Sequence, residues 1–197
     1  MELFLACLAA YILGSIPNGL VFGRLIWHID LREHGSRNIG ATNAWRTLGK
    51  GPGFLIFLLD FLKGAASVCI GMYLVGTPLA AVLAGIFAIV GHSCSLFLKF
   101  HGGKGVATGL GVIVMMMPLP ALLVFLVWLG VVKISGYVSL GSIIAAALVP
   151  VLAWLFEFPP AYIGFGLSAA AFIIIRHHAN IARLLNGTES KIKAGHR

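Results

Sequence analysis

Long apolar runs that carry almost no charge constrain the fold of this chain more than any other feature of its sequence. Hydrophobic residues make up 59% of the 197 residues and charged residues only 10%, whereas about a quarter of the residues in a soluble domain are charged. A helix needs about 20 apolar residues to cross a bilayer. The sequence therefore predicts an all-α integral membrane protein, a seven-transmembrane-helix bundle in which residues 1–197 form a single polytopic domain. The predicted runs are 3–26, 53–75, 79–98, 105–117, 121–132, 138–156 and 161–175.

The distribution of basic residues predicts the orientation of these runs. The connections alternate between a basic set and a set without Lys or Arg, and 13 of the 14 basic residues lie in the basic set or at its helix ends. Because basic loops stay on the cytoplasmic side, we expect the N-terminus outside and the C-terminus in the cytoplasm. The basic set is Arg24, Arg32, Arg37, Arg46, Lys50, Lys99, Lys104, Lys133, Arg176, Arg183, Lys191, Lys193 and Arg197.

Residues 105–132 are the ambiguous part of this topology, because Pro118 and Pro120 interrupt them and each half is short for a complete span. One kinked helix would cross once and would place either the first basic loop or the basic tail outside. Two short helices, or a hairpin that does not fully cross, keep both inside. The sequence therefore favours two segments here.

The chain start and the cysteines suggest no processing or covalent cross-link. Met1 and Glu2 precede the first run without a basic segment, so we interpret that run as a transmembrane helix that is not cleaved. The three cysteines lie in apolar runs without CxxC spacing, and we interpret them as small buried hydrophobes rather than disulfide or zinc ligands. They are Cys7, Cys69 and Cys94.

The first polar segment that could carry chemistry is 34–46, with the sequence HGSRNIGATNAWR. Exposed backbone N–H groups, short hydroxyl and amide side chains and guanidinium groups are the donors that phosphate oxygens need. An ordinary capped loop with a basic edge explains the same residues equally well from spacing alone. The side chains of this kind in the segment are Ser36, Arg37, Asn38, Thr42, Asn43 and Arg46.

The second segment is 101–108, HGGKGVAT, directly before a predicted helix. Gly102 and Gly103 would let the backbone approach a ligand, a helix N-terminus attracts anions, and Lys104 adds a full positive charge. Gly105 occupies the place of the Ser or Thr that binds magnesium in a Walker A loop, so an NTPase is excluded. The alternative is a glycine-rich turn whose lysine reaches lipid headgroups.

The third segment is 176–189, RHHANIARLLNGTE. If it is helical, His177, Asn180 and Arg183 share one face. The alternative is an amphipathic interfacial helix with snorkelling arginines.

Polar residues inside the apolar runs are a separate class. Asp60 and Lys63, at i and i+3, would be costly in lipid unless paired, and we predict an ion pair that stabilises the bundle. For His92 we favour a hydrogen bond between helices over a ligand role. Ser139 and Ser142 begin the sixth run from the inside, within reach of the same membrane level.

Standard catalytic and metal-binding patterns are missing from the sequence. It has no GxSxG, no HExxH and no Asp/Glu cluster, so we expect no metal and no cofactor. An anion-binding surface beside hydrocarbon remains, which suits a substrate with a phosphate head and an acyl tail. A transporter for an anionic solute would need polar residues through the depth of the membrane, and a non-catalytic lipid-binding scaffold would not need three phosphate-suited motifs.

These segments resemble the PlsY family, the bacterial membrane acyltransferases that use acyl phosphate and glycerol 3-phosphate, and the resemblance covers nearly the whole chain. It rests on three motifs in order: Gly35-Ser36-x-Asn38-x-Gly40-Ala41-Thr42-Asn43-x-x-Arg46; Gly91-His92 followed by Phe100-x-Gly102-Gly103-Lys104-Gly105-Val106-Ala107-Thr108; and His177-x-x-Asn180-Ile181-x-Arg183-Leu184-x-x-Gly187-x-Glu189.

The resemblance implies transfer of a fatty acyl group to the 1-hydroxyl of glycerol 3-phosphate, an early step of phospholipid biosynthesis. The products would be lysophosphatidate and inorganic phosphate. The implied partners are acyl phosphate, glycerol 3-phosphate and membrane lipids, with no nucleic acid. The implied location is the bacterial inner membrane, with the active site at its cytoplasmic face.

Roles for individual residues follow from the same resemblance. Lys104 and the backbone around Gly102 and Gly103 would hold one phosphate, and Arg46 with Ser36, Asn38 and Asn43 would hold the other or the leaving group. His177 with Asn180 would position the glycerol hydroxyl or act as its base, although the phosphate of the donor could itself accept the proton. Thr42 and Ser142 complete the predicted substrate-binding set.

Overall fold

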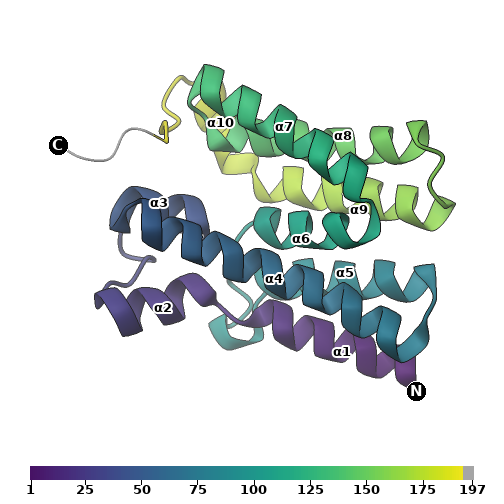
Figure 1. Ribbon diagram of the computed structural model, residues 1–197. Helices are drawn as coiled ribbons and strands as arrows, with labels where there is room; N and C mark the ends of the chain where they lie inside the picture. The colour runs from purple at the N-terminus through teal and green to yellow at the C-terminus, as the bar shows by residue number, and fades with distance from the viewer. Residues whose placement is uncertain (193–197) are drawn as a thin grey trace. The chain divides into compact units, whose positions relative to one another are not determined.

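The computed structural model describes residues 1–192, and within that range the regular structure is helical, without strands (Figure 1). Backbone contacts divide the chain into two compact units, Met1–Met115 and Met116–Arg197. The all-α prediction is therefore confirmed, whereas the single-domain assignment stays a prediction. Lys193 and Arg197, which the topology argument counted in the basic tail, lie outside the described residues.

The first unit comprises α1 (Glu2–Ser15), α2 (Asn18–Trp27), α3 (Ala41–Leu48), α4 (Lys50–Val75), α5 (Pro78–Ser93), the 3₁₀ helix η1 (Leu96–Leu98) and α6 (Val106–Met116). Helices α1, α4 and α5 pack against one another, and α3 packs on α4. Glycines permit these close approaches. A side chain at Gly14 of α1 would overlap the backbone of Ala88 in α5. One at Gly64 of α4 would overlap the backbone of Thr108 in α6. Small residues at such contacts are typical of membrane helices.

The second unit comprises α7 (Pro118–Ser135), α8 (Val138–Leu155), α9 (Pro160–Arg176) and α10 (His178–Leu185). Helix α8 packs against both α7 and α9. Gly136 ends α7 in the left-handed conformation, at φ +81°, so that α8 begins two residues later. A residue with a Cβ would be strained in that conformation.

Each predicted apolar run contains helix, but fewer helices are long enough to span than predicted. Within residues 1–192, five are long and apolar enough, namely Glu2–Trp27, Lys50–Val75, Pro78–Leu98, Pro118–Ser135 and Val138–Leu155. The pair Pro160–Arg176 and His178–Leu185, bent by 60°, would make a sixth if it counts as one span. The run 105–117 contains only Val106–Met116, which is too short. The count of seven transmembrane helices is therefore not confirmed.

The two prolines of the ambiguous run begin a helix rather than ending one. Helix α6 ends at Met116, and Pro118 and Pro120 occupy the first turn of α7. A proline is tolerated there because the first N–H groups of a helix have no intrahelical partner. Two helices rather than one kinked helix are thus confirmed, and the predicted segment 121–132 was too short at both ends.

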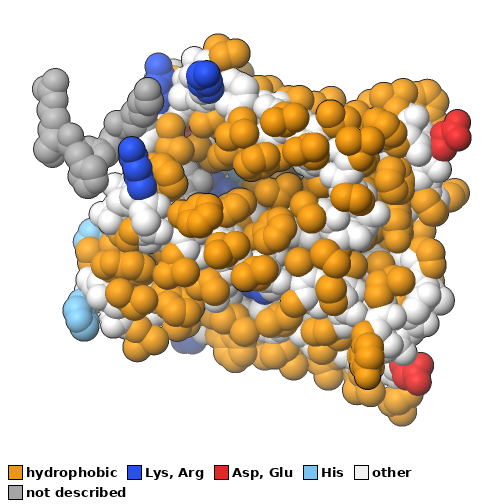
Figure 2. Space-filling model, in the orientation of Figure 1, with side chains coloured by type: hydrophobic (Ala, Val, Ile, Leu, Met, Phe, Trp, Pro, Cys, Tyr) orange, Lys and Arg blue, Asp and Glu red, His pale blue; other side chains and the backbone are white. Residues whose placement is uncertain are grey.

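The prediction of three buried cysteines is wrong in part. Cys7 is buried and Cys94 half-buried, but Cys69 on α4 is exposed. All three are free thiols. The pattern of the run could not show which side of α4 faces outward, because nearly all of its residues are apolar. Figure 2 shows apolar side chains over the sides of the helices in each unit, as expected for surfaces in contact with lipid.

The predicted orientation can be tested by labelling. Thr77, Glu157 and Lys50 are all exposed. In a cysteine-free background, Thr77→Cys and Glu157→Cys should react with an impermeant maleimide added to intact cells, and Lys50→Cys should react only after permeabilisation. Labelling of Lys50→Cys in intact cells would reverse the orientation and place the basic loops outside.

Candidate active site

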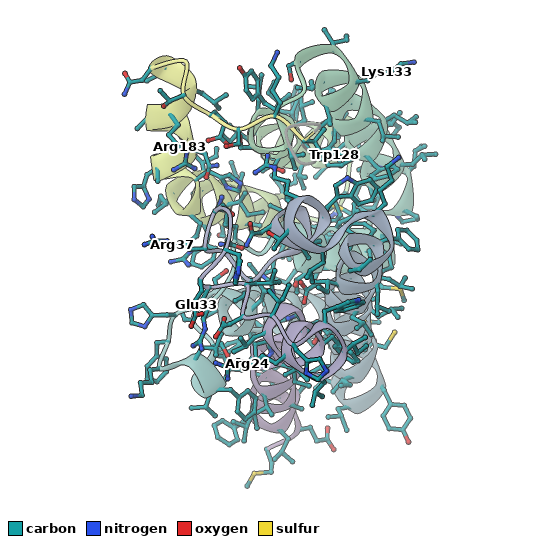
Figure 3. All side chains as sticks on the ribbon, turned by 90° about the vertical axis from the view of Figure 1, so that its left-hand side faces the viewer. Arg24, Glu33, Arg37, Trp128, Lys133 and Arg183 are labelled. Atoms are coloured by element: carbon teal, nitrogen blue, oxygen red, sulfur yellow. The ribbon has the colours of Figure 1, made fainter. Side chains whose placement is uncertain are left out.

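The connection from α2 to α3 holds the first candidate segment, and Asp30 organises its beginning. The carboxylate accepts hydrogen bonds from the guanidinium groups of Arg24, at 2.6 Å, and Arg32, at 2.7 Å. The hydrogen bond from Arg32 holds the pKa of this carboxyl well below its usual range. Figure 3 shows Arg24, Glu33 and Arg37 on this side of the unit. Two of the basic residues predicted for this connection are therefore paired with Asp30.

Asn43, buried in the first turn of α3, fixes the rest of this connection. Its Nδ2 donates to the carbonyl oxygens of Leu31, at 3.0 Å, His34, at 3.0 Å, and Asn38, at 2.8 Å. Its Oδ1 accepts the backbone N–H of Ser36 at 2.9 Å. The amide is thus fully engaged within the loop. This role differs from the predicted one, in which Asn43 was a direct ligand of substrate.

The other predicted ligands of the first segment lie around Asn43. The Ser36 side chain is exposed, and Asn38 Oδ1 accepts the N–H of Gly40 at 2.8 Å. Thr42 and Arg46 are half-buried and lie four residues apart on α3, which places them on one face of the helix. The loop and this face of α3 together present hydroxyl, amide and guanidinium donors.

The second segment forms the turn between η1 and α6. Gly105 has φ +80°, a conformation that glycine adopts without strain. Lys104 is half-buried and directly precedes it. The first turn of a helix carries N–H groups without intrahelical partners, so Lys104 and the start of α6 supply positive charge and donors at one place.

The backbone N–H groups of Gly102 and Gly103, which were predicted to bind a phosphate, donate to the end of α5. The N–H of Gly102 donates to the carbonyl of Ser93 at 2.9 Å, and that of Gly103 donates to the carbonyl of His92 at 3.0 Å. These N–H groups cap the end of α5 instead of facing a phosphate. Side chains at either glycine would overlap atoms of His92, so the glycines are required for close packing on α5.

A buried cluster, the Asp60 cluster, joins α2, α4 and α5 and consists of Asn18, Asp60, Lys63 and His92. Asp60 Oδ1 accepts Nδ2 of Asn18 at 3.0 Å and lies 2.9 Å from Lys63 Nζ and 3.7 Å from His92 Nδ1. Lys63 also donates to the carbonyl of Ile16 at 2.9 Å, where α1 breaks before α2. The predicted ion pair of Asp60 and Lys63 is confirmed.

In the second unit, His177 lies at the bend between α9 and α10 rather than within one continuous helix. It is buried, and its Nδ1 lies 2.7 Å from the carbonyl oxygen of Ile173. A carbonyl oxygen only accepts hydrogen bonds, so Nδ1 carries the hydrogen and Nε2 of the neutral ring is the basic nitrogen.

Glu189 links the residues of the third segment. Its Oε1 accepts Nδ2 of Asn180 at 2.7 Å and the hydroxyl of Ser139 at 2.7 Å, and its Oε2 accepts Nε of Arg183 at 2.7 Å. Asn180 and Arg183 thus share a face of α10, as predicted. Figure 3 labels Arg183 on this part of the unit. The third motif contains Glu189, but the sequence predicts no role for it, although a buried carboxylate is rare in this chain.

Ser142 is buried and already engaged within the helix pair α7 and α8. Its hydroxyl donates to the carbonyl of Val138 at 2.9 Å and accepts Nε1 of Trp128 at 3.3 Å. Of the two serines at the start of α8, Ser139 therefore belongs to the network around Glu189, while Ser142 supports helix packing. The sequence placed both at the same level and could not separate them.

Comparison with known proteins identifies the kind of protein to which these motifs belong. The profile of the family described as glycerol-3-phosphate acyltransferase matches residues 4–187. A glycerol-3-phosphate acyltransferase 2 of Moorella thermoacetica is 49% identical over 188 residues, which cover 95% of this chain and 96% of that protein. A glycerol-3-phosphate acyltransferase of Carboxydothermus hydrogenoformans is 46% identical over 190 residues, 96% of each chain.

Two crystal structures of PlsY, described as an integral membrane glycerol 3-phosphate acyltransferase, have the same fold. The glycerol 3-phosphate form superposes with a TM-score of 0.93 at 41% identity, covering 97% of this chain and 96% of that one. The lysophosphatidic acid form superposes with a TM-score of 0.89 at 39% identity, covering 97% and 95%. The similarity extends along the chain rather than being confined to the three motifs.

Proposed function

We propose a reaction for this chain, which belongs to the glycerol-3-phosphate acyltransferase family: it transfers a fatty acyl group from acyl phosphate to the 1-hydroxyl of sn-glycerol 3-phosphate. The products are 1-acylglycerol 3-phosphate and inorganic phosphate. The acceptor and the lipid product correspond to the molecules named for the two solved relatives. The acyl phosphate donor is what the resemblance of the three motifs to the PlsY family implies.

One observation carries the proposal most directly. Lys104 stands half-buried at the start of a helix, on a turn packed against α5. Cationic and N–H donors at a helix N-terminus suit a phosphate oxyanion. The chain also has helices that are apolar enough for a membrane. A substrate with a phosphate head and an acyl tail could therefore place its head at this turn and its tail in the hydrocarbon of the membrane.

In the proposed reaction each group has the role that the resemblance implies. The 1-hydroxyl oxygen attacks the carbonyl carbon of acyl phosphate, the new ester C–O bond forms, and the C–O bond to phosphate breaks. Lys104 and Arg46 stabilise phosphate charge in the substrates and in the leaving group. The hydroxyl proton passes either to Nε2 of His177, whose Nδ1 is held by the carbonyl of Ile173, or to an oxygen of the departing phosphate. Asn180, oriented by Glu189, positions the acceptor.

The proposed setting is the inner membrane of a bacterium, with the reaction at the cytoplasmic face. The basic connections on which this orientation rests include both Arg46 and Lys104. In that setting the acceptor arrives from the cytoplasm, and the acyl product remains in the membrane.

Purified protein in detergent tests the reaction. Incubation with palmitoyl phosphate and radiolabelled glycerol 3-phosphate should yield lysophosphatidate and inorganic phosphate in equal amounts. Acyl-CoA, or acyl-carrier protein loaded with a fatty acyl group, should give no product when it replaces acyl phosphate. Lysophosphatidate formed from acyl-CoA alone would overturn the assignment of the donor.

Turnover should need neither a divalent metal nor a nucleotide. Acyl phosphate is already activated, and Lys and Arg can supply the charge stabilisation that a metal would otherwise provide. Activity in excess EDTA should therefore equal that in magnesium. Loss of activity in EDTA that is restored by added magnesium would contradict this prediction.

A further inference from the structure

His92 connects the Asp60 cluster to the glycine turn that precedes Lys104. Its Nδ1 lies 3.7 Å from Asp60 Oδ1. Its Nε2 faces Gly103 so closely that a side chain at this position would overlap it, and such a side chain would also lie 2.8 Å from Cε1. Its carbonyl accepts the Gly103 N–H at 3.0 Å. The ring and the backbone carbonyl of His92 thus both contact Gly103, the residue before Lys104.

The ion pair by itself does not require a histidine. Lys63 balances the charge of Asp60, and Asn18 donates a hydrogen bond to the same carboxylate. A carboxylate beside Nδ1 favours the tautomer with the hydrogen on Nδ1 and restricts the orientation of the ring. His92 is only 5% exposed, so its ring is confined between Asp60 and the turn.

We propose that His92 is a positioning residue for acyl transfer. Asp60 orients its ring, the ring and carbonyl set the place of Gly103, and Gly103 sets the place of Lys104. This inference rests on the proposed function, because it assigns His92 to the phosphate-binding turn of that reaction. In this role His92 acts through the position of Lys104 rather than through a contact of its own with a substrate.

The expected effect is large enough to measure. A displacement of about 1 Å in a substrate-positioning group can cost about a hundredfold in rate. His92→Ala removes the ring that supports the turn, and we expect kcat/KM to fall by about tenfold to a hundredfold. A positioning role predicts that KM rises for one of the two phosphate substrates while KM for the other stays within about twofold. His92→Gln, whose side chain can still fill part of this space, should recover part of the loss.

Ser67→Ala is the matched control. Ser67 is buried on α4, one turn beyond Lys63, and its hydroxyl donates to the Lys63 carbonyl at 2.8 Å. Ser67→Ala removes a buried hydroxyl group from α4, the helix that carries Asp60, and leaves the glycine turn unchanged. Both KM values should remain at wild-type levels.

Asp60→Asn should raise the same KM as His92→Ala, to a smaller extent, because the ring stays while its orienting charge is lost.

A double substitution tests the contact without relying on turnover. Gly103→Ala introduces the Cβ that overlaps the His92 ring and should lower the melting temperature in the wild-type background. In a His92→Ala background the new methyl group has room, so the same substitution should lower it much less. Additive effects would show that the ring does not determine the position of the turn.

The outcomes separate this inference from the proposed function. If wild-type protein makes no lysophosphatidate, the proposed function fails, whatever the melting temperatures show. If wild-type protein is active and His92→Ala has unchanged KM values, with kcat lowered only in proportion to the folded fraction, His92 is a packing residue and the inference is overturned. If His92→Ala does not fold, His92→Gln and Gly103→Ala provide the same comparison of KM values.

Discussion

Replacing Lys104 with alanine should lower kcat/KM by about tenfold to a hundredfold. Hydrogen bonds to charged groups contribute about 1.5–3 kcal/mol each, and about 1.4 kcal/mol corresponds to a tenfold change in rate. The structure adds a reason to expect the upper part of this range. The N–H groups of Gly102 and Gly103 donate to backbone carbonyls at the end of α5. The turn therefore has fewer backbone donors that could compensate for a lost ammonium group.

Lys99→Ala is the control for this prediction. Lys99 is exposed, five residues earlier, outside the glycine turn, and its replacement should cost little activity. Both variants must be compared as folded, monodisperse protein in detergent, since misfolding would imitate a catalytic loss. Equal and mild effects of the two substitutions would identify Lys104 as an anchor for lipid headgroups, and the phosphate-binding interpretation of the turn would be wrong.

Glu189→Gln should reduce both stability and activity. The carboxylate accepts hydrogen bonds from buried Asn180 and Ser139 as well as from Arg183. The amide that replaces it presents an N–H group to at least one of these donors. Losing a buried charged hydrogen bond should lower the melting temperature by about 3–10 °C, and disorienting Asn180 should lower kcat/KM by about tenfold or more.

Glu33→Gln is the matched control, because Glu33 is exposed on the loop between α2 and α3 (Figure 3). It should leave the melting temperature and kcat/KM unchanged. A Glu189→Gln protein as stable and active as the Glu33→Gln protein would show that the carboxylate network does not organise Asn180.

The same network has a pH dependence of defined sign. Burial raises the pKa of Glu189, but hydrogen bonds from Ser139, Asn180 and Arg183 outweigh it, so the pKa lies below its usual value. The carboxylate therefore stabilises the fold fully above its unfolded pKa of about 4.3. This contribution is lost as the pH falls through the lower folded pKa. The difference in melting temperature between wild type and Glu189→Gln should be constant near neutral pH and should shrink below about pH 4.3.

The sequence alone determined the fold class, the approximate places of the long apolar helices, and the family. Hydropathy along a run depends on local composition. Three motifs in order were enough to identify the glycerol-3-phosphate acyltransferase family, to which residues 4–187 match. The ion pair of Asp60 and Lys63 was also predictable, because a spacing of three residues places both groups on one helix face.

The tertiary structure decided which polar groups bind one another. Asn43 and the N–H groups of Gly102 and Gly103 were predicted to hold phosphate, yet they bind the protein itself. His92, Asp60 and Gly103 come from three different places in the sequence, and no local pattern could bring them together. The partners of a donor are set by which segments pack side by side. Spacing along the chain shows which groups are available for chemistry, whereas packing shows which of them the fold has already used.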